Sequence, residues 1–128
     1  MSMNERSRTA RNLSETNSPL TPAVFYILVA LADGDRHGYA IMRDVSKRSG
    51  GTVHLGPGTL YGAINRLLRD GLIEESEERP NPETDDRRRR YYRLTGLGER
   101  ALAAEAKRLE DLARLARSTR TVRKLKNA

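Results

Sequence analysis

The stretch 56–73, GPGTLYGAINRLLRDGLI, constrains the fold of this chain more than any other part of the sequence. Its apolar residues recur at helical spacing and form one stripe: Leu60, Ala63, Ile64, Leu67 and Leu68. Pro57 suits the first position of a helix, and Gly71 suits the residue just past its end. The other face holds hydrogen-bond donors, namely Thr59, Tyr61, Asn65, Arg66 and Arg69. This pattern predicts a short helix whose polar face either stays solvated or enters a DNA groove.

Length and charge bound the class of protein. The chain has 128 residues and a net charge of +7, from 24 Lys and Arg against 17 Asp and Glu. That length fits one domain, and that charge favours a polyanionic partner, either nucleic acid or an acidic membrane surface. The longest apolar run, residues 23–32, is far shorter than the roughly 20 residues of a membrane helix. With no cysteine, a disulfide framework and a Cys zinc site are excluded. We therefore expect a cytoplasmic protein with no membrane partner.

Residues 1–18 are polar, lack the apolar segment of a secretory signal, and carry Arg6, Arg8 and Arg11. They predict a flexible basic N-terminal tail. A basic arm that folds back onto DNA is the alternative.

A first helix is predicted to begin after Thr21, which suits an N-cap and is followed by Pro22. Its body, residues 23–32, is apolar almost all round, so it must be covered on several sides. In so small a domain this predicts a central core helix that also meets a partner subunit, with Phe25 and Tyr26 at the contact.

A second helix is predicted over residues 39–49, after a turn at residues 33–38. Ile41, Met42 and Val45 should face inward, and the pair Gly50-Gly51 should end the helix. Residues 52–55 form a short extended link to the stretch 56–73. Two helices joined by a brief connection that contains glycine predict a helix-turn-helix.

After residue 73 the sequence pattern changes from that of a helix to that of two extended strands in a hairpin. Residues 73–78 are acidic, residues 89–94 are aromatic and basic, and turn-forming residues separate them. Opposite charges are expected to pair across the two strands. Tyr92, in phase with Leu94, should be a core residue, whereas Tyr91 should be partly exposed. Together with the helices, this hairpin predicts a winged helix-turn-helix over residues 19–94.

A last helix is predicted over residues 95–118, capped by Thr95, and followed by a basic tail at residues 119–128. Its apolar residues are spaced three, four and seven apart, a stripe suited to another helix. The fold class is therefore mainly α with a small β-hairpin: a winged helix-turn-helix followed by a C-terminal helix that must bury one side.

Three motifs in this chain resemble the PadR family of bacterial transcriptional regulators: ALADGDRHGYAI, GPGTLYGAINRLLRDGLI and RRRRYYRLTGLG. They follow one another in the family's order and spacing, and the single short C-terminal helix resembles the smaller subgroup of the family. The resemblance implies a homodimeric winged-helix repressor in which the C-terminal helix packs against the first helix of the partner. The last helix would then be a C-terminal dimerisation helix, and the expected dimer interface comprises Phe25, Tyr26, Leu102, Leu109, Leu112 and Ala116. The chain departs from the family pattern at Gly56, usually Ser or Thr, and at Gly62, often Pro. These two glycines leave the start of the helix with fewer side chains. Base contacts known for the family are therefore less securely assigned to the residues near it.

DNA binding would use donor side chains on the helix 57–70, on the helix before it and on the wing. Asn and Arg are the side chains able to make bidentate contacts with adenine and guanine, and wing arginines suit phosphates or the minor groove. A solvated run paired with Asp85 and Asp86 is the alternative for the wing arginines. The expected DNA-binding residues are Arg43, Lys47, Gly58, Thr59, Tyr61, Asn65, Arg66, Arg87, Arg88 and Arg89.

An enzyme is not expected. Residues 51–56 have the glycine spacing of a phosphate-binding loop, but Pro57-Gly58 follows where Lys and Ser or Thr are required. His37 and His54 have no His or Cys at metal-ligand spacing, so no metal or cofactor is expected. His37 is interpreted as a hydrogen-bond donor in the turn and His54 as a partly exposed strand residue.

Two questions about partners stay open at this point. Relatives in the PadR family respond to phenolic or lipophilic compounds at the dimer interface, which implies a small hydrophobic or phenolic effector here. With one Phe, five Tyr and no Trp, however, the chain has few aromatic side chains for such a cavity. A winged helix used for protein–protein binding, without specific DNA binding, is the alternative function, although the exposed arginines argue against it.

Overall fold

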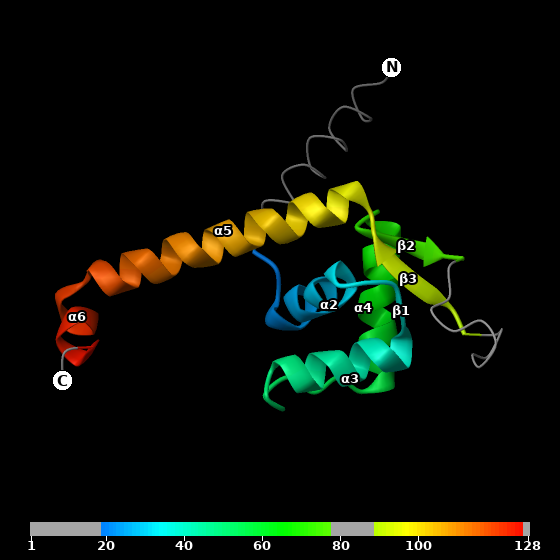
Figure 1. The fold of residues 1–128 in the computed structure, drawn as a ribbon, viewed down its shortest axis with the longest axis horizontal. Coiled ribbons are helices and arrows are strands. Elements are labelled where there is room, and N and C mark those ends of the chain that lie inside the picture. The colour runs from blue at the N-terminus through cyan, green and yellow to red at the C-terminus, as the bar shows by residue number, and fades with distance from the viewer. Residues whose placement is uncertain (1–18, 78–88, 127–128) are drawn as a thin grey trace, which may run out of the picture.

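The computed structural model describes residues 19–77 and 89–126 (Figure 1). The expectations for the N-terminal tail, the hairpin tip, Arg87 and Arg88 lie outside these residues. The elements are α2 (Pro22–Ala32), β1 (Arg36–His37), α3 (Gly38–Arg48), α4 (Pro57–Arg69), β2 (Ile73–Ser76), β3 (Tyr91–Leu94), α5 (Gly96–Ser118) and α6 (Arg120–Lys126). The predicted class, mainly α with a small antiparallel sheet, is confirmed.

Helix α2 lies at the centre of the core, in contact with α3, α5 and β3. The Thr21 side chain caps it by accepting a hydrogen bond from the backbone N–H of Val24 at 3.2 Å, as the sequence predicted. Ile27 and Leu28 are fully buried, and the cluster around them takes in the buried faces of α3, α4 and the sheet. The helix is apolar on nearly every side because elements cover it from several directions.

Helices α3 and α4 begin and end where local sequence signals direct. Helix α3 ends before Gly50 and Gly51, which take positive φ values of 62° and 83°, a region that favours glycine. Helix α4 begins at Pro57 and ends before Gly71, whose φ is 76°. The stripe on α4 is buried as predicted: Leu60, Ala63, Ile64 and Leu67.

The sheet contains a strand that the sequence pattern missed. Its order is β1-β3-β2, with β3 antiparallel to both neighbours. Arg36 and His37, predicted to be part of a turn, pair with Tyr92 and Tyr91. A strand of two residues has no periodicity of its own, and this one exists because the distant strand β3 offers it hydrogen-bond partners.

The expectation for Tyr91 was wrong. Tyr91 and Tyr92 are both buried, with 6% and 5% of their surface exposed. Tyr92 joins the main core, where burial raises the pKa of its phenol. The His37 ring lies edge-on to the Tyr91 ring, with centroids 5.3 Å apart. Both faces of β3 are covered at this point because β1 brings His37 alongside it.

The first half of α5 belongs to the core of the single chain. Thr95 Oγ1 caps the helix by accepting from the backbone N–H of Gly98 at 3.0 Å, and it donates to the backbone O of Gly71 at 2.6 Å. Ala101 is fully buried, and the buried Glu105 carboxylate accepts from Arg108 Nε at 2.8 Å. This contact lowers the pKa of the Glu105 carboxyl. These contacts fix the start of α5 against the winged helix.

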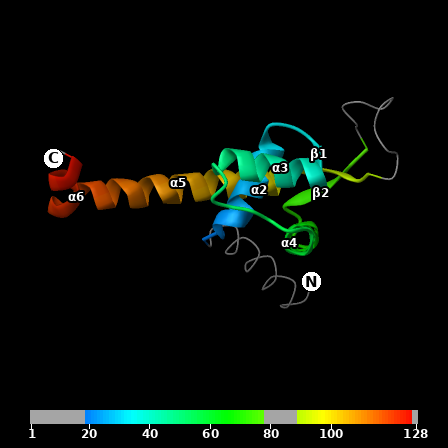
Figure 2. The ribbon, with the colours of Figure 1, turned by 90° about the horizontal axis from the view of Figure 1, so that it is seen from below.

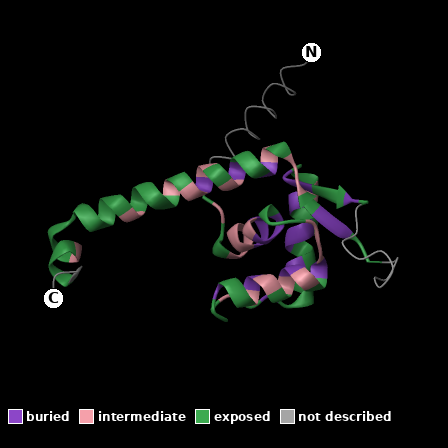
Figure 3. Cartoon of the chain, viewed as in Figure 1, coloured by how far each residue is buried: buried purple, intermediate pink, exposed green. Residues whose placement is uncertain are grey.

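The second half of α5 leaves the rest of the molecule. Figures 1 and 2 show it projecting away from the other elements towards α6, and Figure 3 shows its surface largely exposed. Residues 120–126, predicted to be part of a basic tail, form α6 instead. The projecting segment carries three large exposed apolar side chains, Leu109, Leu112 and Leu115.

Candidate nucleic-acid interface

Helix α4 presents an outward face made of small and polar residues. Gly58, Gly62, Asn65 and Arg69 are exposed and lie four, three and four residues apart, so they share the face opposite the buried stripe. Thr59 and Arg66 lie on one flank of this face and Tyr61 on the other. The sequence pattern predicted that these residues are exposed, but it did not distinguish those on the outward face from those on its flanks. Arg69, absent from the expected DNA-binding residues, lies on the outward face itself.

The entrance of α4 is bare. Its N-cap, Gly56, has no side chain to bond the first backbone N–H groups. A Cβ atom added at Gly56, Gly58 or Gly62 would meet nothing within 4 Å. Packing within the described part of the chain therefore gives no reason for glycine at these positions, although glycine costs a helix interior about 1 kcal/mol relative to alanine. The bare entrance leaves the α4 backbone open to a partner.

Arg43 and Lys47 are exposed on α3, beside this entrance. They line an open cleft of about 790 Å³ together with His54, Gly56 and Pro57. The Arg43 guanidinium carbon lies 5.8 Å from the centre of the Tyr39 ring. His54, predicted to be a partly exposed strand residue, is exposed and lies outside any strand. The flank of the helix-turn-helix thus holds two cations and an imidazole at its surface.

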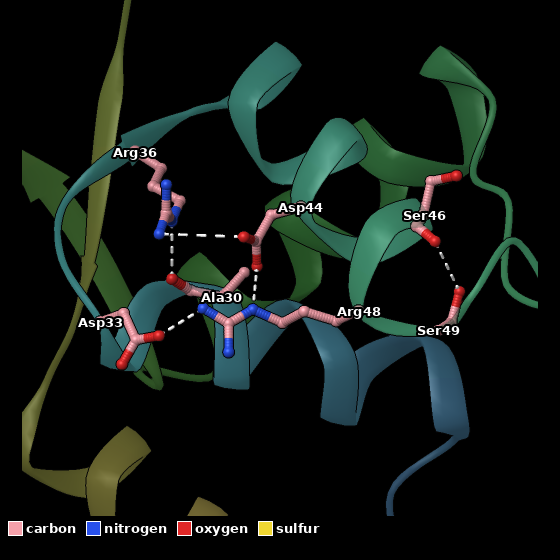
Figure 4. A network of polar contacts seen from close by, with 7 residues as sticks. All are labelled: Ala30, Asp33, Arg36, Asp44, Ser46, Arg48 and Ser49. Atoms are coloured by element: carbon pink, nitrogen blue, oxygen red, sulfur yellow. Dashed lines mark hydrogen bonds and ion pairs between the residues drawn. The ribbon is translucent and has the colours of Figure 1, made fainter.

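A network of ion pairs positions α3 against α2 (Figure 4). Arg36 Nε donates to the backbone O of Ala30 at 2.8 Å, and Arg36 Nη2 lies 3.8 Å from Asp44 Oδ1. Arg48 Nε donates to Asp44 Oδ2 at 2.5 Å, and the same guanidinium binds Asp33. These carboxylates raise the pKa of Arg48.

The network distinguishes cations that are held in ion pairs from cations that are exposed and could bind a partner. Arg36 and Arg48 are engaged by carboxylates, whereas Arg43 and Lys47 point to solvent. The positioning role of Arg36 could not be predicted from the sequence. The sequence indicated only the Asp44–Arg48 pair of this network, because the two residues lie four apart on one helix.

The wing pairs its charges as predicted. Glu74 and Arg93 face each other in the register of β2 and β3, and Arg93 Nε donates to Glu74 Oε1 at 2.9 Å. Arg90 Nε lies 3.6 Å from Glu75 Oε1. Arg89 is exposed just before β3, on the side of the hairpin tip. These ion pairs neutralise the negative charge of Glu74 and Glu75 on the surface of the wing.

His37 joins the wing to the helix-turn-helix, and in the turn it accepts a hydrogen bond where the sequence predicted that it would donate one. Its Nδ1 accepts from the backbone N–H of Ala40 at 3.1 Å and so caps α3. Its Nε2 lies 3.1 Å from Arg89 Nη1. The first turn of α3 has unpaired N–H groups, and a residue at its N-cap is placed to accept from them.

The residues expected at the dimer interface lie along α2 and α5. Phe25, Tyr26 and Leu102 are half-buried in the single chain, whereas Leu109, Leu112 and Ala116 are exposed. Within residues 19–77 and 89–126, three or more potential metal ligands nowhere gather into a site. In the same residues, every helix falls short of the length or hydropathy needed to cross a bilayer.

Fold and surface together define the class of protein: a winged helix-turn-helix whose open recognition helix is flanked by cations on α3 and on the wing, the architecture of a DNA-binding regulator. The model of the transcriptional regulator PadR-like family matches residues 27–104. The chain therefore belongs to the PadR-like family of transcriptional regulators, which are not enzymes.

Individual relatives agree with this assignment. The transcriptional regulator Rv3488 of Mycobacterium tuberculosis is 39% identical over 89 residues, which cover 70% of this chain and 77% of the relative. RosR from H. salinarum is 28% identical, with a TM-score of 0.55 over 84% of this chain and 87% of that one. A PadR family transcription regulator from Clostridium difficile R20291, 24% identical, shares the fold with a TM-score of 0.63 over 74% of this chain and 94% of that one.

Proposed function

We propose that this PadR-like regulator is a cytoplasmic homodimeric repressor that places two copies of α4 in successive major grooves of a pseudo-palindromic operator. The observation that carries the proposal is the outward face of α4, polar and bare at its entrance, with cations beside it on both sides. Two recognition helices related by a two-fold axis would read half-sites about 34–36 Å apart.

Every expected DNA contact except Tyr61 has a specific role in this proposal. Asn65 and Arg66, with Thr59, reach the base edges, because amide and guanidinium groups can bond adenine and guanine in the major groove. Gly58 lets the α4 backbone approach the groove closely. Arg43 and Lys47 bind the flanking phosphates, and Arg87, Arg88 and Arg89 extend the wing to the backbone or the minor groove.

Dimerisation follows from the exposed apolar side of α5. Leu109 and Leu112 are 40% and 48% exposed, and they lie one helical turn apart on a segment that, within the described residues, projects away from the winged helix (Figure 1). A second copy would cover them by setting α5 against α2 of the partner, where Phe25 and Tyr26 are half-buried. A small hydrophobic or phenolic effector that enters this interface would shift the two recognition helices and release the DNA.

The role of α4 in base recognition is tested by Asn65→Ala and Arg66→Ala. Each is expected to weaken binding to the operator by about 1–3 kcal/mol and to relax specificity at one base pair. Both side chains are exposed, so the free energy of unfolding should change little. The operator can be located by footprinting the protein on the DNA that flanks its own gene, and affinities can then be measured by fluorescence anisotropy.

The matched control is Arg123→Ala on α6, which removes an exposed arginine far from α4. It should leave specificity for the operator unchanged. If Asn65→Ala and Arg66→Ala bind the operator as tightly as the unsubstituted protein, the two residues do not take part in base recognition. The orientation of α4 on DNA must then be different.

A further inference from the structure

A small cavity lies between the start of α2, the second half of α4 and the start of α5. It has a volume of about 220 Å³. Pockets for drug-sized ligands measure about 300–1,000 Å³, whereas an apolar cavity of about 150 Å³ holds a molecule the size of benzene. The cavity therefore has room for one small apolar group. Buried and half-buried apolar side chains line it: Leu20, Val24, Ala63, Leu67, Leu97 and Ala101.

Two opposite charges border this apolar space. Arg66 and Asp70 line the cavity with exposed side chains, and they lie four residues apart, on the same side of α4. Within the described part of the chain, neither of them forms an ion pair with another residue. The cavity therefore offers a ligand one cation and one anion beside an apolar interior.

The cavity is separate from the proposed dimer contact on α2. Val24 lies three and four residues before Ile27 and Leu28, which are fully buried, so it shares their side of the helix. Tyr26, two residues after Val24, points to nearly the opposite side. A partner subunit set against Tyr26 therefore does not use this cavity.

We propose that the cavity binds a free α-amino acid with an apolar side chain. The side chain fills the apolar space, the α-carboxylate accepts from the Arg66 guanidinium, and the α-ammonium donates to the Asp70 carboxylate. An apolar molecule with a carboxylate alone would be repelled by Asp70, and one with an amine alone would be repelled by Arg66. The two charges of the protein therefore select a small molecule that carries both.

The bound amino acid competes with DNA for Arg66. This step rests on the proposed function, because it takes Arg66 to reach a base edge. A guanidinium that binds the carboxylate of the ligand is not available to the base, so the amino acid lowers the affinity for the operator. By linkage, the operator lowers the affinity for the amino acid by the same factor.

Isothermal titration calorimetry on the full chain tests the cavity without DNA, with L-leucine, L-methionine and L-phenylalanine as probes. We expect at least one of them to bind. Its amide and its N-acetyl derivative, each of which lacks one of the two charges, should bind at least about tenfold more weakly. Asp70→Asn should weaken the amino acid about tenfold and should weaken the N-acetyl derivative no further. The matched control is Glu110→Gln, which removes an exposed carboxylate from α5 and should bind all three compounds as before.

Three calorimetric results would overturn the inference. They are no binding by any of the three amino acids, equally tight binding of the amide or the N-acetyl derivative, and amino-acid binding that Asp70→Asn leaves unchanged.

Fluorescence anisotropy then measures the competition, on a duplex selected from random sequences by the unsubstituted protein. An amino acid at a saturating concentration should lower the duplex affinity about tenfold, within the usual range of coupling between two sites, and the loss should be smaller for Asp70→Asn at the same concentration. Duplex affinity that the bound amino acid leaves unchanged would overturn the competition for Arg66. If the protein binds no duplex, the proposed function fails, whereas the calorimetry still decides whether the cavity binds an amino acid.

Discussion

Gly98→Ala is expected to destabilise the folded protein by about 3 kcal/mol, the upper range for overpacking a tight site. A Cβ atom at position 98 would lie 1.9 Å from the backbone O of Leu72. That oxygen also accepts from the backbone N–H of Thr95 at 3.1 Å, so neither α5 nor the segment before β2 can move without losing a hydrogen bond. Urea unfolding followed by circular dichroism measures the change.

Gly96→Ala is the matched control for this substitution. It lies in the same first turn of α5, but the nearest atom to its added Cβ is Arg100 Nη1 at 3.5 Å, the far end of a flexible side chain. Its free energy of unfolding should stay within about 0.5 kcal/mol of the unsubstituted protein. Equal stabilities for Gly98→Ala and Gly96→Ala would show that α5 does not pack against Leu72 as described.

Leu109→Glu combined with Leu112→Glu is expected to convert the proposed dimer into a folded monomer. Both leucines are exposed in the single chain, so charge there should not unfold it, but two carboxylates cannot be buried without partners in an interface. Loss of the second recognition helix should lower operator affinity by a factor of about 10²–10⁴. Sedimentation velocity gives the assembly state, and fluorescence anisotropy gives the affinity.

These two point substitutions isolate dimerisation better than truncation does. Cutting the chain after Arg100 would also remove Ala101 and Glu105, which are buried in the single chain. The control is Lys107→Gln with Arg114→Gln, which lowers the net charge by the same two units on the opposite face of α5. A dimer that persists with both glutamates in place would show that the interface lies elsewhere on the chain.

Helices α2 to α5 could be predicted because their signals are local. The spacing of the buried residues on α4 and the flanking Pro57 and Gly71 are all contained in one stretch of sequence. The cap at Thr21 and the end of α3 at Gly50 are local in the same way. The exposed side chains of α4 followed from the same spacing.

The features that sequence reasoning missed depend on contacts between distant residues. Strand β1 forms only because β3 passes beside it, and the edge-on contact between the His37 and Tyr91 rings depends on the same pairing. The engagement of Arg36 by Asp44 likewise needs the turn after α2 to be in place. None of these contacts leaves a periodic pattern in the chain.

The central claim is that this face of the molecule binds DNA through its cations, and the salt dependence of duplex affinity tests it most directly. Counterion release lowers log affinity linearly with log salt, by about 0.9 for each phosphate neutralised. Arg43, Lys47 and one wing arginine at a phosphate in each protomer make six phosphate contacts in a dimer, which predict a slope of about −5 on this scale. A steep linear decline of that size is the expected result. A flat response would contradict the account and would favour a winged helix that binds another protein.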